Sequence, residues 1–184
     1  MTTLDWTGQL LGQLTWHWEH QLRPRLDGLT DDEYFWEPVA DAWTLRPRGT
    51  GSATMPGGAG AYTVDFAYPA PDPAPVTTIA WRLAHVIVGV FAMRNATHFG
   101  GPPTDFDTFD HAGTAGAALA QLDREYARWV DGVRGLDAEG LAAPCGEHGY
   151  ADEPMAALVL HIHREVIHHG AELSLLRDLY RRRV

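Results

Sequence analysis

The chain has 184 residues and a formal net charge of −10 at pH 7, and all 14 of its basic residues are arginines. An acidic surface repels phosphate backbones, which argues against nucleic acid as a partner, and no stretch reaches the roughly 18 apolar residues of a membrane-spanning helix. The single cysteine, Cys145, excludes an internal disulfide, and the residues from Met1 to Asp5 lack the features of a signal peptide, so we expect a cytoplasmic protein.

The first predicted helix runs from about Asp5 to Leu26. Its apolar residues recur at four-residue spacing along one face: Trp6, Leu10, Leu14, Trp18 and Leu22. We expect Pro24 to end or kink this helix, because proline removes a backbone donor. Thr30 and Glu33 then have the spacing of a capping box, which predicts a short helical turn through Trp36.

Residues 38–76 are rich in proline, glycine, alanine and serine. A loop of this length is often a lid or a binding loop. Its aromatic residues favour packing against the rest of the chain: Trp43, Tyr62, Phe66 and Tyr68. A floppy surface insertion explains the same composition equally well, and we expect no convincing strand pair.

Three further long helices are predicted after this loop. The second long helix begins at residue 77 or 78 and continues to about residue 97, before a Gly-Gly-Pro-Pro stop. The third covers about 114–133, with one more turn at 137–141. The fourth opens at Asp152-Glu153-Pro154 and runs to about Tyr180. This pattern predicts an all-α four-helix bundle in one domain spanning residues 1–184.

The last predicted helix concentrates four of the ten histidines of the chain between residues 161 and 169. On a helical wheel with about 100° per residue, His169 lies within the apolar stripe and Glu165 lies on its edge. His161 and His168 lie further out, and His163 points to the opposite side.

Glu165 and His169 are one helical turn apart, so both side chains can reach one ion. A buried carboxylate without a partner is costly, and it must be neutralised, hydrogen-bonded or bound to a cation. Imidazole and carboxylate together suit Zn²⁺ best, and also Ni²⁺, Mn²⁺ or Fe²⁺. A purely structural Glu–His pair explains this helix equally well.

A third ligand is predicted on the second long helix. His85 stands in an almost wholly apolar run beside a stripe of small residues: Thr78, Gly89, Ala92 and Ala96. Small neighbours leave room for a ligand next to the histidine. A lone core histidine more often bonds a backbone carbonyl, but in combination with Glu165 and His169 we expect His85 to bind metal.

Other polar residues carry weaker signals. We expect the histidines at helix ends and in loops to be solvated: His98, His111 and His148. Cys145 has no base positioned beside it, so we expect it not to be catalytic. The arginines from Arg177 to Arg183 complement the dipole of the last helix, and a binding patch is the less favoured alternative.

Two motifs resemble the DinB/YfiT-like superfamily. The sequence from Trp81 to His85 is similar to the signature of its second helix, and the sequence from His161 to Arg177 is similar to its last-helix motif. The resemblance implies a four-helix bundle of DinB/YfiT type that holds one divalent metal through His85, Glu165 and His169. Many members have histidine where this chain has Glu165. A His, Glu, His set is instead similar to that of mycothiol-dependent maleylpyruvate isomerase.

The resemblance implies a thiol-dependent S-transferase or isomerase that uses a low-molecular-weight thiol such as mycothiol. His161 or His168 would handle protons, and Arg82 would bind a substrate carboxylate. The alternative is a metal- or small-ligand-binding protein without turnover, such as a stress-response factor, and a third reading is a purely structural helical protein. An exposed apolar helix face, together with the resemblance, favours a homodimer.

Overall fold

The computed structural model describes residues 4–183, most of which are helical. Two long helical segments have a π-helical part: α1 (Trp6–His17), η1 (Trp18–Leu22) and α2 (Arg23–Arg25) form the first, and α4 (Ile79–Ala84), η2 (His85–Ala92) and α5 (Met93–His98) form the second. The other helices are α3 (Asp31–Tyr34), α6 (Ala115–Arg134), α7 (Ala138–Ala142) and α8 (Met155–Arg182). The first three residues, used in the signal-peptide argument, lie outside the described range.

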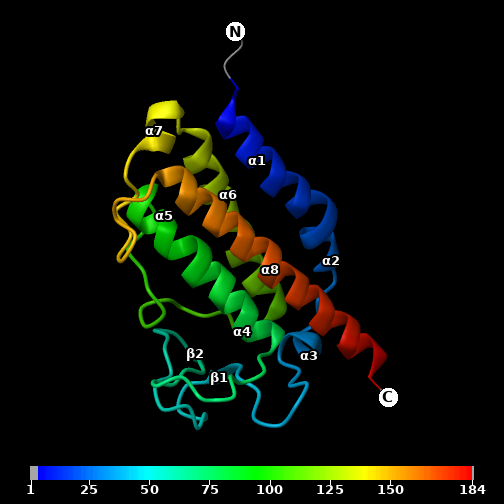
Figure 1. Ribbon diagram of the computed structural model, residues 1–184. Helices are drawn as coiled ribbons and strands as arrows, with labels where there is room; N and C mark the ends of the chain where they lie inside the picture. Colours follow the sequence, from blue (N-terminus) through cyan, green and yellow to red (C-terminus); the bar gives the residue numbers. More distant parts are fainter. Residues whose placement is uncertain (1–3, 184) are drawn as a thin grey trace.

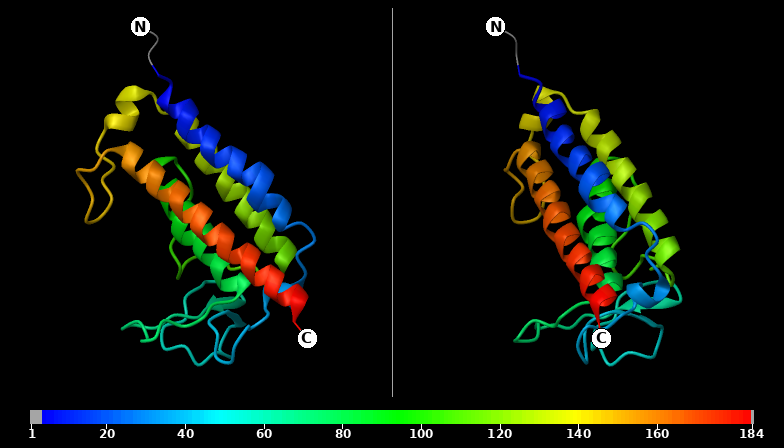
Figure 2. Two further views of the ribbon diagram at one scale, coloured as in Figure 1. Left: turned by 45° about the vertical axis from the view of Figure 1, so that its right-hand side comes forward. Right: turned by 90° about the vertical axis from the view of Figure 1, so that its right-hand side faces the viewer.

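The four long helical segments lie side by side (Figures 1 and 2). α8 contacts α4 and η2 on one side and α1 and η1 on another. Their apolar faces form a shared core with large, fully buried side chains: Trp129, Phe91, Leu14, Leu83, Leu122 and Ile162. None of the helices within residues 4–183 has both the length and the apolar character needed to cross a membrane.

The π-helical turns explain how the first segment accommodates Pro24. The sequence offered two expectations for Pro24, that it ends the helix or that it kinks it. The first is wrong, because the helix continues to Arg25. The wider turns of η1, from Trp18 to Leu22, come directly before it. Proline lacks the backbone donor of a regular helix, and a wider turn accommodates that loss.

Residues 38–76 contain a short antiparallel strand pair, so the expectation of no strand pair is wrong. β1 (Leu45–Pro47) pairs with β2 (Tyr62–Val64), with Leu45 opposite Val64. Both of these residues are buried, so this part of the segment is not a floppy insertion. In Figure 1 the pair lies at the end of the helices where α4 begins. Strands of three residues are too short to show an alternating pattern in the sequence.

Candidate metal centre

Three side chains from two helices meet where η2 begins opposite the middle of α8. His85 is the first residue of η2, and Glu165 and His169 lie one turn apart on α8. One ligand atom from each residue lies within 4.8 Å of the other two. His169 Nε2 is 3.3 Å from Glu165 Oε2, and the rings of His85 and His169 meet edge to face with centroids 4.6 Å apart. The structure thus brings together the three residues expected from the sequence.

The surroundings of His85 keep its ring neutral and fixed. Its ring stacks on that of Trp81, with centroids 5.7 Å apart and planes 8° from parallel. Burial, followed by the neighbouring His169 and Arg82, lowers the pKa of His85 to about 4. A neutral imidazole near pH 7 has the free lone pair that a metal ion requires.

Glu172 is a site residue that the sequence reasoning missed. Its Oε2 lies 2.7 Å from His169 Nδ1 and 3.0 Å from the Nε of Arg82. Because a carboxylate only accepts hydrogen bonds, it holds the proton of His169 on Nδ1 and leaves Nε2 free toward Glu165. The signal in the sequence was the i, i+3 spacing of His169 and Glu172, which places both on one face.

Arg82, the third residue to which the sequence assigns a catalytic role, lies beside this cluster. We expected it to bind a substrate carboxylate, but its guanidinium is already paired with the carboxylate of Glu172. The side chains of Arg82 and Glu172 are only 22% and 31% exposed. Arg82 thus ties the second long helical segment to α8 beside His169.

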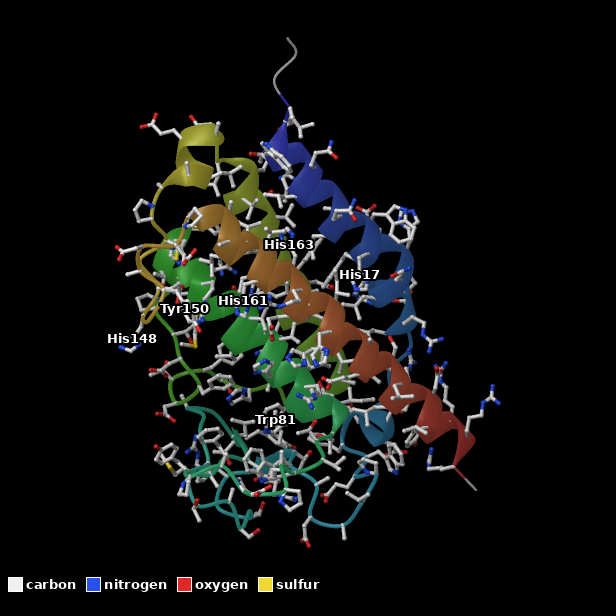
Figure 3. The ribbon with its side chains drawn as sticks, viewed as in Figure 1. His17, Trp81, His148, Tyr150, His161 and His163 are labelled. Atoms are coloured by element: carbon white, nitrogen blue, oxygen red, sulfur yellow. The ribbon has the colours of Figure 1, made fainter. Side chains whose placement is uncertain are left out.

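His161 and His168 lie next to the three residues but not among them. His161 Nδ1 is 3.7 Å from Glu165 Oε1 and accepts a hydrogen bond from the Arg164 guanidinium at 2.6 Å; Figure 3 shows His161 on α8. His168 is 63% exposed, with Nε2 3.5 Å from Glu172 Oε1. Ligand atoms of His168, His169 and Glu172 also lie within 4.8 Å of one another, but all three come from one helix.

Three other histidines are more buried than the sequence suggested. His163, expected on the side away from the apolar stripe, is buried and accepts a hydrogen bond from Trp129 Nε1 at 3.3 Å. His111 is buried as well, and His98 Nε2 lies 2.9 Å from Glu147 Oε1. For His163 the reason is that the apolar stripe marks only the most apolar side of α8, whereas this helix packs against neighbours on several sides. His148 is exposed, as expected.

A cavity of about 670 Å³ opens beside His85. It lies between the 38–76 segment and the beginning of the second long helical segment, with Trp81 and His85 in its wall. Figure 3 shows Trp81 at this end of the helices, near the 38–76 segment. The donor set fits a divalent metal ion, since two imidazoles and one carboxylate are common ligands of Zn²⁺ and of similar cations.

The family model of the DinB superfamily matches residues 13–173. This range includes His85, Glu165 and His169, and the chain belongs to the DinB superfamily. No curated protein and no solved structure matches the chain.

Proposed function

We propose that this protein is a divalent-metal-dependent enzyme, a thiol-dependent S-transferase or isomerase that works with a low-molecular-weight thiol such as mycothiol. The observation that carries the proposal is the meeting of His85, Glu165 and His169, with ligand atoms within 4.8 Å of one another, beside a large cavity. Three protein ligands leave coordination positions open, which is typical of catalytic rather than structural zinc sites. Zn²⁺ is the proposed ion, with Ni²⁺, Mn²⁺ and Fe²⁺ as alternatives.

Each side chain of the site has a distinct part in this proposal. When bound, a divalent cation supplies positive charge that favours a thiolate over a thiol near neutral pH. Glu165 offsets part of that charge, and Glu172 holds the proton on Nδ1 of His169. His161 is proposed to handle protons, and its Nδ1 lies 3.7 Å from Glu165 Oε1.

A metal- or small-ligand-binding protein without turnover, for example a stress-response factor, is the second candidate. The positions of His161 and His168 favour it. The lone pair on His161 Nδ1 already accepts from Arg164, and His168 is 63% exposed and next to Glu172 rather than Glu165. Each of these histidines thus already contacts a charged side chain of α8.

A thiol-consumption screen on untagged protein separates these proposals. The purified protein is assayed for bound metal and then incubated with mycothiol, bacillithiol or glutathione and a panel of electrophiles. We expect one equivalent of metal and thiol consumption that chelation abolishes. Stoichiometric metal without consumption of any thiol would favour the binding protein, and no metal at all would contradict both the enzyme and a metal-binding protein.

A matched pair of variants links any activity to the site. His169→Gln removes a ligand, and His20→Gln changes an exposed histidine on the first helical segment. We expect the first variant to lose bound metal and activity, and the second to keep both. Equal loss in both variants would assign the effect to folding rather than to the site.

The proposal also includes the wider arrangement expected from the sequence. The side-by-side arrangement of the long helical segments supports a four-helix bundle of DinB/YfiT type within one domain. The single cysteine, Cys145, has no disulfide partner in the chain, which supports a cytoplasmic location. Exposed apolar side chains on α8 support a homodimer: Leu160, Ile167, Leu175 and Leu179. Light scattering of the purified protein tests the dimer directly.

A further inference from the structure

Several aromatic side chains line the cavity beside His85. Trp81 and Phe106 form two of its walls, and Met55 and Phe66 of the 38–76 segment form a third. The segment is held in place by backbone hydrogen bonds, in which Met55 N–H donates to Phe66 O at 3.0 Å. The volume of about 670 Å³ lies within the range of small-molecule sites.

The ring walls are braced by specific contacts. Trp81 Nε1 donates to the carbonyl oxygen of Asp65 at 2.8 Å, so its polar atom is already satisfied. The ring of Trp43 lies behind it, 6.0 Å from Trp81 and 5.9 Å from Phe66 between centroids. Phe106 packs closely over Gly89, where a Cβ atom would lie 3.1 Å from the Phe106 ring. Flat apolar groups therefore suit this cavity.

The charged groups of the cavity are carboxylates. Asp65 is 5% exposed, and its charge is offset by Arg46 Nε at 3.0 Å and by a hydrogen bond from the backbone N–H of Thr44. Asp107 is exposed, and no ion pair involves it within residues 4–183. No arginine lines this cavity. Among the described residues that line the cavity, Asp107 is thus the charged side chain without an ion pair.

We infer that this cavity binds a ring-bearing apolar substrate whose charged group, where it has one, is a cation directed toward Asp107. The inference rests on the proposed function in one respect: the end of the substrate that reacts is taken to be the end beside His85.

Three small probes with one ring and different charges test this inference. Binding of 2-phenylethylamine, 2-phenylethanol and phenylacetate is measured by calorimetry on the chelator-treated protein, because a metal ion at His85 would itself attract the acid, and again with zinc added. In the chelator-treated protein we expect the amine to bind more tightly than the acid. Asp107→Asn should weaken amine binding by about two- to five-fold, the size of one exposed charge pair, and leave the alcohol unchanged. Asp110→Asn, which removes an exposed carboxylate outside the lining, is the matched control.

Two further measurements locate the bound probe. Phe66→Ala removes part of the apolar wall and should weaken all three probes, whereas a probe bound elsewhere would be unaffected. Equal binding of amine and acid, unchanged in Asp107→Asn, would overturn the charge preference. The same titrations with chelator separate this inference from the proposed function, because ring binding that persists without metal supports the cavity even where no thiol is consumed.

Discussion

Oε2 of Glu172 lies 2.7 Å from Nδ1 of His169 and 3.0 Å from Nε of Arg82, so a single carboxylate joins α8 to the second long helical segment. A carboxylate that accepts from the distal nitrogen of a histidine fixes its tautomer and increases its basicity as a ligand. Glu172 thus has no need to touch a metal ion in order to affect its binding.

We predict that Glu172→Gln weakens metal binding by about 10- to 100-fold, the range found for such outer partners. The glutamine side chain keeps the size of the glutamate but loses the charge that pairs with Arg82. Competition with a fluorescent chelator measures the dissociation constant. Glu139→Gln changes an exposed carboxylate on α7 and serves as the control; equal affinity in both variants and the wild type would show that Glu172 has no such role.

We predict that His111 makes the protein less stable in mild acid. Burial, the largest effect, lowers the pKa of His111, so the folded state keeps the ring neutral while the unfolded state takes up a proton below a pH of about 6.5. Because the unfolded state then binds more protons, the free energy of unfolding decreases as the pH is lowered, by at most about 1.4 kcal/mol per pH unit for one group.

Urea unfolding at pH 7 and pH 5 checks the contribution of His111. His111→Gln keeps a donor for the carbonyl oxygen of Phe106 but removes the titration. We expect the wild type to lose more stability than this variant between the two pH values. His148→Gln alters an exposed histidine and should behave like the wild type. A parallel pH dependence in all three proteins would contradict the assignment.

The extents of the helices after residue 100 follow closely from local sequence signals. The predicted helix at 114–133 is α6, Ala115–Arg134, and the turn at 137–141 is α7, Ala138–Ala142. Both begin after residues whose side chains cap the helix, Thr114 and Asp137. Caps and apolar spacing act within a few residues, and a sequence shows them directly.

Features that depend on distant partners were not predictable in this way. Leu45 and Val64 pair across a long connection, and nothing local to either strand specifies the other. The role of Glu172 likewise depends on Arg82, which comes from another helix. The expectation for His85 rested on its small neighbours, but Phe106 from a distant loop packs over Gly89 beside it.

We predict that the buried pair of Arg177 and Glu33 stabilises the fold rather than binding a ligand. Arg177 Nε lies 3.1 Å from Glu33 Oε1, and the two side chains are 3% and 5% exposed. Arg177→Met leaves Glu33 with the partly exposed Arg181, whose Nε lies 3.2 Å from Glu33 Oε1, so the free energy of unfolding should fall by less than the roughly 3–5 kcal/mol of a fully broken buried pair. Arg182→Met, at an exposed position, is the control.

Two results would contradict this prediction for Arg177. The first is a stability loss no larger than that of the control. The second is a double variant, Arg177→Met with Glu33→Met, whose loss in the free energy of unfolding equals the sum of the two single losses. Two residues of one ion pair should instead show a coupling energy. Metal content should be unchanged in every variant, since neither residue belongs to the candidate metal centre.

We predict that Glu165→Gln separates metal binding from stability. The Glu165 side chain is 26% exposed and lies 3.3 Å from His169 Nε2, so without metal the loss of its charge changes the free energy of unfolding little, by about 1 kcal/mol or less. With metal, the variant lacks the anionic ligand that offsets the charge of the cation, and its affinity should fall by at least the 10- to 100-fold typical of outer partners.

Melting temperatures of wild type and variant, each with and without chelator, distinguish these contributions. We expect chelator to lower the melting temperature of the wild type by more than that of the variant. A variant that melts far below the wild type in both conditions, with normal metal content, would instead make Glu165 a structural residue.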